Sequence, residues 1–190
     1  MPRHPGKRTE PRAFKITVVG DGTVGKTCLL ISYTKNQFPT EYVPTVFDTH
    51  RTTISVDGTE HPITLWDTAG QEQYDRLRYL TYPKTDCFIV CYSVDKPTSF
   101  DNIMEKWHPE LKNYCPNAAI ILVGTKSDLK GTNPIIVSSK QAKKMKSRIK
   151  AYKHLECSAQ TRENLEDVFV EAVRAVLAKS RRSILPCKIT

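Results

Sequence analysis

A glycine-rich stretch near the N-terminus constrains the fold of this chain more than any other feature. Residues 20–27 read Gly-Asp-Gly-Thr-Val-Gly-Lys-Thr and match the pattern G-x-x-x-x-G-K-[ST] at every specified position. The glycines let the backbone curl so that successive N–H groups point at a phosphate. The pattern places Lys26 near the β- and γ-phosphates of a nucleotide, and the Thr27 hydroxyl where it can bind Mg²⁺.

The flanking segments favour a true phosphate-binding loop over a chance glycine-rich turn. A β-rich run at 14–19 precedes the loop, and an apolar segment at 28–34 follows it. That segment can open a helix whose positive end faces the phosphates. In this loop and the start of the helix, the residues expected to contact nucleotide are Gly22, Thr23, Val24, Gly25, Lys26, Thr27 and Cys28.

Length and cysteine usage narrow the class of protein. A chain of 190 residues suits one compact domain. Its six cysteines form no C-x-x-C pair, which indicates reduced thiols and neither a disulfide framework nor a zinc site. No apolar run approaches the roughly 20 residues of a membrane-spanning helix, and residues 1–12 lack the apolar core of a secretory signal.

The net charge of +9 is concentrated in residues 1–15, 129–155 and 179–190. The middle segment holds eight basic residues and no acidic residue. The simplest interpretation is a solvated face, and a surface for anionic lipid is the alternative. Nucleic acid is disfavoured as a partner because Tyr152 is the only aromatic residue available there for stacking on bases.

The order of strand-like and helix-like segments predicts an α/β fold. Two prolines make 36–48 a loop, and Asp57-Gly58 is a strong hairpin-turn signal. We expect the P-loop NTPase architecture, with a mostly parallel six-stranded sheet, one antiparallel edge strand and helices on both faces. The expected strands are 14–19, 49–56, 61–66, 87–92, 118–123 and a short one from 154; the expected helices are 28–34, 100–114, 138–150 and 165–177.

A second motif predicts which base the nucleotide carries. Thr125-Lys126-Ser127-Asp128 follows a continuous apolar strand, at the edge of a parallel sheet where ligands bind. The Asp128 carboxylate can accept hydrogen bonds from the N1–H and N2–H₂ groups of guanine, whereas adenine would leave it unpaired. The Lys126 stem would lie along one face of the base and Phe38 along its other edge. Ser158-Ala159 would offer a backbone N–H to the guanine O6.

With these motifs in order, the chain resembles a small GTPase of the Ras superfamily. It is most similar to the Rho family and, within it, to Rac-like members. The resemblance covers residues 14–178. The stretches that carry it are 41–48 (EYVPTVFD), 66–78 (WDTAGQEQYDRLR), Trp107-His108-Pro109-Glu110 and Glu156-Cys157-Ser158-Ala159, together with Thr125, where most relatives outside the Rho group carry Asn.

The resemblance implies a first switch at residues 36–48. Tyr42 would cover the nucleotide there, and Thr45 would complete the coordination of Mg²⁺ while its N–H senses the γ-phosphate. Asp67, at the end of a strand, would join Thr27 and Thr45 as the third metal-binding residue.

The resemblance implies a second switch at residues 67–80. The Gly70 N–H would contact the γ-phosphate and Gln71 would orient the attacking water, so that Gln71 and Lys26 are the expected catalytic residues. No arginine occurs in 36–48, and we therefore expect slow hydrolysis that an activating protein accelerates by supplying one. The two switches would bind that protein, an exchange factor, a dissociation inhibitor and effectors, and the chain would act as a monomer in actin-linked signalling.

Three features depart from the Rho pattern. Only thirty positions separate Asp128 from Ser158, so most of the helical insertion usual in Rho relatives is absent. Thr23 replaces a residue that is usually Ala or Gly. Cys187 is a prenylation-type cysteine four residues from the end, but Lys188 takes the usual aliphatic position.

These features divide the chain into a flexible basic arm (1–12), a GTPase domain (13–178) and a basic tail (179–190). We expect a cytoplasmic protein whose tail binds the anionic inner face of the plasma membrane. A scaffold that holds nucleotide without turnover is the alternative function. An ATP-using enzyme conflicts with Asp128 and with the lack of a further substrate domain.

Overall fold

The computed structural model describes residues 12–41, 45–131 and 136–184. The predictions made for Tyr42 and Cys187 fall outside these residues. No helix of the described part is long and apolar enough to cross a membrane.

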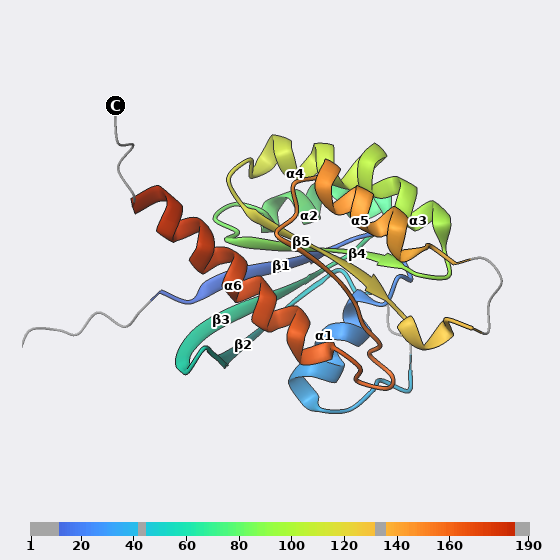
Figure 1. Cartoon of the computed structure of the whole chain (residues 1–190), viewed down its shortest axis with the longest axis horizontal. Helices are drawn as coiled ribbons and strands as arrows, with labels where there is room; N and C mark the ends of the chain where they lie inside the picture. The colour runs from blue at the N-terminus through green and yellow to red at the C-terminus, as the bar shows by residue number, and fades with distance from the viewer. Residues whose placement is uncertain (1–11, 42–44, 132–135, 185–190) are drawn as a thin grey trace, which may run out of the picture.

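A six-stranded sheet in the order β2-β3-β1-β4-β5-β6 forms the centre of the molecule (Figure 1). Within the described chain, β2 pairs antiparallel with β3 at one edge, and every other neighbouring pair is parallel. The predicted fold class is therefore confirmed. The strands are β1 (Phe14–Val19), β2 (Phe47–Val56), β3 (Thr59–Thr68), β4 (Cys87–Ser93), β5 (Ala119–Thr125) and β6 (Lys153–Glu156).

Helices cover both faces of the sheet. The α-helices are α1 (Lys26–Lys35), α2 (Asp75–Thr81), α3 (Pro97–Asn102), α4 (His108–Tyr114), α5 (Ser139–Arg148) and α6 (Leu165–Ile184). A π-helical segment, Ile103–Trp107, joins α3 to α4, and 3₁₀ turns occupy Glu72–Tyr74 and Ser127–Leu129. Helices α1 and α6 pack on one face, and α2 to α5 lie on the other (Figure 1).

The central strands are buried on both sides, as their continuous apolar runs predict. In β4, Ile89 and Cys91 face the core under α1 and α6, whereas Phe88 and Val90 face the core under α3 to α5. The five described cysteines are free thiols, in agreement with the expected reduced state. Burial raises the pKa of the Cys157 thiol to about 12, so this side chain behaves as an apolar core group.

Several element boundaries differ from the sequence prediction. Strand β2 begins at Phe47 rather than at residue 49, because its pairing with β3 extends to Thr68. The helix expected from residue 100 begins at Pro97, a residue whose fixed φ suits a first helical turn. Helix α2 was missed within a stretch interpreted as polar: its buried residues are Arg78 and Thr81, and no apolar stripe marks it.

Helix α6 is held to α1 by an aromatic contact deep in the core. Phe169 is fully buried and stacks on Tyr33 with ring centroids 3.9 Å apart. We expect Phe169→Ala to lower the free energy of unfolding by about 3–5 kcal/mol, because it removes the ring and leaves a cavity. Urea denaturation measures this loss. Leu80→Ala, at a side chain that is 76% exposed, is the control and should change stability by less than about 0.5 kcal/mol.

Candidate nucleotide-binding site

The glycine-rich loop connects β1 to α1 in a turn that needs glycine at two positions. Gly20 and Gly25 have φ values of 142° and 93°, which residues with a side chain rarely adopt. A Cβ on Gly20 would also lie 2.3 Å from the carbonyl oxygen of Cys91 in the neighbouring strand. The loop is thus seated tightly on the sheet and presents the N-terminus of α1, a favourable place for a phosphate.

Lys26 lies beneath this loop with its charge turned toward the backbone. Its Nζ donates to the carbonyl oxygens of Gly20 and Asp21 at 2.8 and 2.7 Å, and 6% of the residue is exposed. Burial lowers the pKa of Lys26, an effect that the nearby Asp67 carboxylate opposes. A cation held this way is suited to an anionic ligand, which would offer it stronger partners than two carbonyls.

Three oxygen-bearing side chains meet beside the loop. The Thr27 hydroxyl donates to Asp67 Oδ2 at 2.6 Å and lies 2.7 Å from the Thr45 hydroxyl. Asp67 is 2% exposed, and its Oδ1 has no hydrogen-bond partner among the residues that the structure describes. Burial raises the pKa of this carboxyl, while the hydrogen bond from Thr27 lowers it.

These three oxygen-bearing side chains fit Mg²⁺ as ligands. A single carboxylate with hydroxyl groups is typical of sites where Mg²⁺ also binds substrate phosphates, and the buried, unpartnered Oδ1 of Asp67 is available as a ligand or as an acceptor from a bound water. The described residues contain no cluster of three or more His, Cys, Asp or Glu side chains that would suit a transition metal instead.

The segment after β3 lies directly on the phosphate loop. A Cβ on Gly70 would lie 2.3 Å from Gly20 O and 2.5 Å from Gly22 N, so only glycine permits this approach. A Cβ on Gly22 would be 3.6 Å from Cγ of Gln71. The backbone of residue 70 and the side chain of residue 71 are therefore positioned over the phosphate-binding turn.

Two adjoining cavities follow this edge of the sheet. The larger, about 430 Å³, is lined by the phosphate loop, by part of the first predicted switch, including Thr45, and by Gly70 and Gln71. The smaller, about 140 Å³, is lined by residues of the base motif. The predicted site residues in the smaller cavity are Gly25, Cys28, Phe38, Thr125, Lys126, Asp128 and Ala159. Gly25, Cys28, Phe38 and Lys126 line both cavities, so a polyphosphate and an attached base have one continuous space.

Two of the predicted residues are buried and hold the backbone around the site by hydrogen bonds. The Thr125 hydroxyl donates to the carbonyl oxygens of Val24 and Tyr92 at 2.5 and 3.0 Å, which ties the base motif to the phosphate loop. Ser158 is fully buried, its N–H donates to Glu163 O at 3.1 Å, and only Ala159 of the predicted pair lines the cavity. Val24 is likewise fully buried.

Thr23 adopts an unusual backbone conformation. Its φ of 66° is left-handed, which is costly for a β-branched residue. Its hydroxyl accepts a hydrogen bond of 2.8 Å from Lys96 Nζ, contributed by the loop after β4. Thr23, which departs from the Rho pattern, therefore has a hydrogen-bond partner in Lys96 that the sequence does not indicate.

Sequence reasoning missed the side chains that hold the phosphate loop from outside. Both carboxylate oxygens of Asp21 are engaged, one by Trp107 Nε1 at 2.7 Å and the other by Asn102 Nδ2 at 2.6 Å. Arg78 stacks over the Trp107 ring, with its guanidinium carbon 4.8 Å from the ring centroid. The partners of Asp21 lie more than eighty residues away, and in the sequence Trp107 stood out only as a mark of family resemblance.

Arg78 links this arrangement to the start of the second predicted switch. It is 1% exposed, donates to both carboxylate oxygens of Glu110 at 3.1 and 2.9 Å, and donates to Ala69 O at 3.2 Å. Burial disfavours its charge, but the Glu110 carboxylate outweighs that effect and raises the pKa of Arg78. The base of the predicted second switch is therefore anchored to α4 by a paired, buried charge.

Comparisons with known proteins agree with this geometry. Residues 15–178 match the model of the Ras family. The chain belongs to the Ras family. This Ras-family protein is also 52% identical over 181 residues to the Ras-like GTP-binding protein RhoL of Drosophila melanogaster, an alignment that covers 94% of the chain and 95% of that relative. Ras-family proteins are GTP hydrolases that bind GTP and GDP, generally with Mg²⁺, and that act with regulators and effectors.

The Arg78–Glu110 pair provides a test of the anchoring in this Ras-family protein. We expect Arg78→Met to lower the free energy of unfolding by about 3–5 kcal/mol, because the Glu110 carboxylate is left buried without its cation. The double variant Arg78→Met/Glu110→Gln should recover part of that loss. Chemical denaturation of the two single variants and the double variant measures the coupling, and strictly additive losses would contradict it.

Proposed function

We propose that this protein is a Rho-like molecular switch, with Rac-like members as its nearest functional type. It would hydrolyse GTP slowly on its own and engage effectors while GTP is bound. The observation that carries the proposal is the contact of Thr27, Thr45 and Asp67. It joins the phosphate loop, the proposed first switch and β3, so a change at the γ-phosphate can act on both proposed switches.

The chemistry follows from positioning and charge. Thr27, Thr45 and Asp67 would hold Mg²⁺, which when bound supplies positive charge to the β- and γ-phosphate oxygens. Lys26 would leave the carbonyls of Gly20 and Asp21 for those oxygens. Gln71 would orient the attacking water through its side-chain amide. Gly70 would direct its N–H at the γ-phosphate, an approach that its contact with the phosphate loop supports.

The first switch contains no arginine, since none occurs between Asn36 and Asp48. We propose that an activating protein supplies this charge in trans. Gly22 supports the idea, because its missing side chain leaves room beside Gln71 for an incoming guanidinium.

The two switches together would present the surface for effectors and for the other regulators. Ala69 N donates to Val46 O at 3.2 Å, so the ends of the switches are hydrogen-bonded to each other. Val46, Phe47, Leu77 and Leu80 are large apolar side chains exposed on these segments. Exposed apolar groups gathered this way are characteristic of a protein-binding surface.

The setting in the cell belongs to the same proposal. We propose a monomer in the cytoplasm that acts in actin-linked signalling. Peripheral attachment to the inner face of the plasma membrane would use the basic tail at 179–190, with a lipid on Cys187. The GTPase domain would span 13–178, between the basic arm and this tail.

Gln71→Leu tests the catalytic assignment. We expect single-turnover hydrolysis of GTP to fall by at least about tenfold while the affinity for GTP is retained, because the water loses its orienting amide. Glu72→Gln, at a neighbouring exposed side chain, is the matched control and should hydrolyse like the wild type. Equal rates for wild type and Gln71→Leu would refute the role of Gln71. A wild type that binds GTP with no measurable turnover would favour the nucleotide-holding scaffold.

Asp128→Ala tests whether Asp128 recognises the guanine base. We expect the variant to lose most of the preference for guanine over adenine nucleotides, about 10²-fold or more, because Asp128 is the one carboxylate among the described residues that line the smaller cavity. Competition binding with GDP and ADP measures the ratio. A preference for guanine that survives this substitution would show that other groups read the base.

A further inference from the structure

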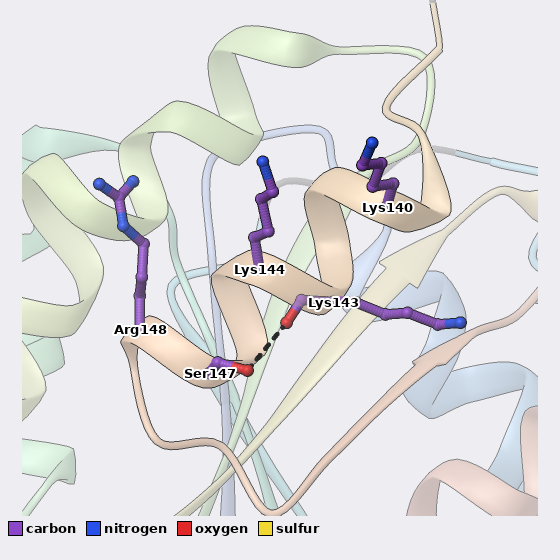
Figure 2. Close-up of a pocket in the computed structure, with 5 residues that line it drawn as sticks. All are labelled: Lys140, Lys143, Lys144, Ser147 and Arg148. Carbon is purple, nitrogen blue, oxygen red and sulfur yellow. Dashed lines mark hydrogen bonds between the residues drawn. The ribbon is translucent and has the colours of Figure 1, made fainter.

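Helix α5 carries a dense basic surface. Its ten residues include five basic side chains and no acidic one. Figure 2 shows Lys140, Lys144 and Arg148 side by side along one side of the helix, at i, i+4 and i+8, with Lys143 directed to the other side. These four residues and Ser147 line a shallow hollow, and we call them the α5 basic face.

No acidic side chain neutralises this face. In the part of the chain that the structure describes, none of the ion pairs includes a basic side chain of α5. Glu156, at the end of β6, is in contact with Ser139 at the start of α5 and forms an ion pair with Lys130. The charges of the α5 basic face are therefore available to an external anion.

The α5 basic face is unfavourable for the isolated helix. Like charges four residues apart repel each other, and Lys140 in the first turn opposes the helix dipole. The helix forms because Ser138 and Gln141 make a capping box and because Ala142 and Met145 are buried against the core. Burial of the opposite side of α5 thus stabilises the helix, and of the α5 basic face only Arg148, in the last turn, is favourably placed for the helix dipole.

The end of α5 and the last part of α6 approach the same end of β5. Tyr152 N, just after α5, donates to Ile120 O at 2.7 Å, while Lys179 Nζ donates to the carbonyl oxygen of Asn117. The basic tail begins at Lys179. The last turns of α5 and α6 therefore both lie near the start of β5, on opposite faces of the sheet.

The sheet separates this region from the switches. Helix α5 leads into β6 at one edge of the sheet, whereas the first switch leads into β2 at the other edge (Figure 1). A flat partner in contact with the α5 basic face leaves Val46 and Phe47 accessible to effectors.

We infer that the α5 basic face binds the anionic headgroups of a membrane and holds the GTPase domain against the bilayer. The hollow is lined by four basic side chains and one serine, with no aromatic or apolar group to anchor a protein and none to stack on bases. Three of the four are lysines, which act as hydrated point charges without a demanding geometry. A fluid layer of anionic headgroups needs only such charges.

This contact is distinct from the proposed lipid on Cys187 and from nucleotide turnover, so it can be tested on the unmodified full-length chain. The probe is co-sedimentation with vesicles of phosphatidylcholine containing about one third phosphatidylserine. We expect Lys144→Gln/Arg148→Gln to bind about 25-fold more weakly than wild type, because each basic residue near the surface contributes about fivefold. The control Lys35→Gln/Arg51→Gln removes the same charges from exposed positions on α1 and β2 and should bind nearly as well as wild type.

Folding of the variants is checked by thermal unfolding, where the midpoint should change little, because the loss of like-charge repulsion offsets the loss of Arg148 from the last turn of α5. Equal binding of the α5 variant and the control overturns the inference, as does equal wild-type binding to vesicles of pure phosphatidylcholine. Binding to polyglutamate in the absence of vesicle binding also overturns it and favours an acidic protein partner. None of these outcomes alters GTP hydrolysis, so the proposed switch function is judged separately.

Discussion

The parallel pairing of β1 with β3 is the constraint on which the rest of this site depends. Val18 lies opposite Asp67 in that register, and the Thr68 hydroxyl donates to Val18 O at 2.7 Å. The chain segments that leave the two strands must therefore emerge side by side at the carboxyl edge of the sheet. That is why the backbone of Gly70 touches the phosphate loop, and why a carboxylate at the end of β3 meets a hydroxyl at the start of α1.

The proposed second switch has a buried, hydrogen-bonded base and an exposed apolar surface. Arg78 fixes its base to Glu110 and to Ala69 O, and the same guanidinium lies on Trp107, which holds Asp21 of the phosphate loop. Leu77 and Leu80, by contrast, are exposed on the helix that follows the loop. A segment built this way can rearrange around residues 70–74 without releasing α2 from the domain, which suits a loop that responds to one phosphate group.

Much of the fold was predictable because its signals are local. Continuous apolar runs identified β4 and β5, the Asp57-Gly58 turn identified the hairpin, and the phosphate-loop and base motifs identified the nucleotide edge. Helix α2 was missed because a buried arginine, and not a periodic apolar stripe, holds it in place. The Thr23–Lys96 and Asp21–Trp107 contacts were missed because they join residues more than seventy positions apart, and no local pattern encodes such a distance.

By itself the sequence determined the chemistry that the chain carries: a phosphate-binding turn that requires its glycines, and a base motif with one carboxylate. It also determined an order of strands and helices that is typical of a mostly parallel sheet. Only the tertiary structure decided which of these groups meet, since Thr27, Thr45 and Asp67 come from three elements and are brought together by strand register. The structure likewise decided that α5 keeps its lysines outside, where they form no ion pair with the acidic side chains that the structure describes. Spacing along a chain specifies local conformation, whereas proximity and burial arise only when the sheet and its helices pack.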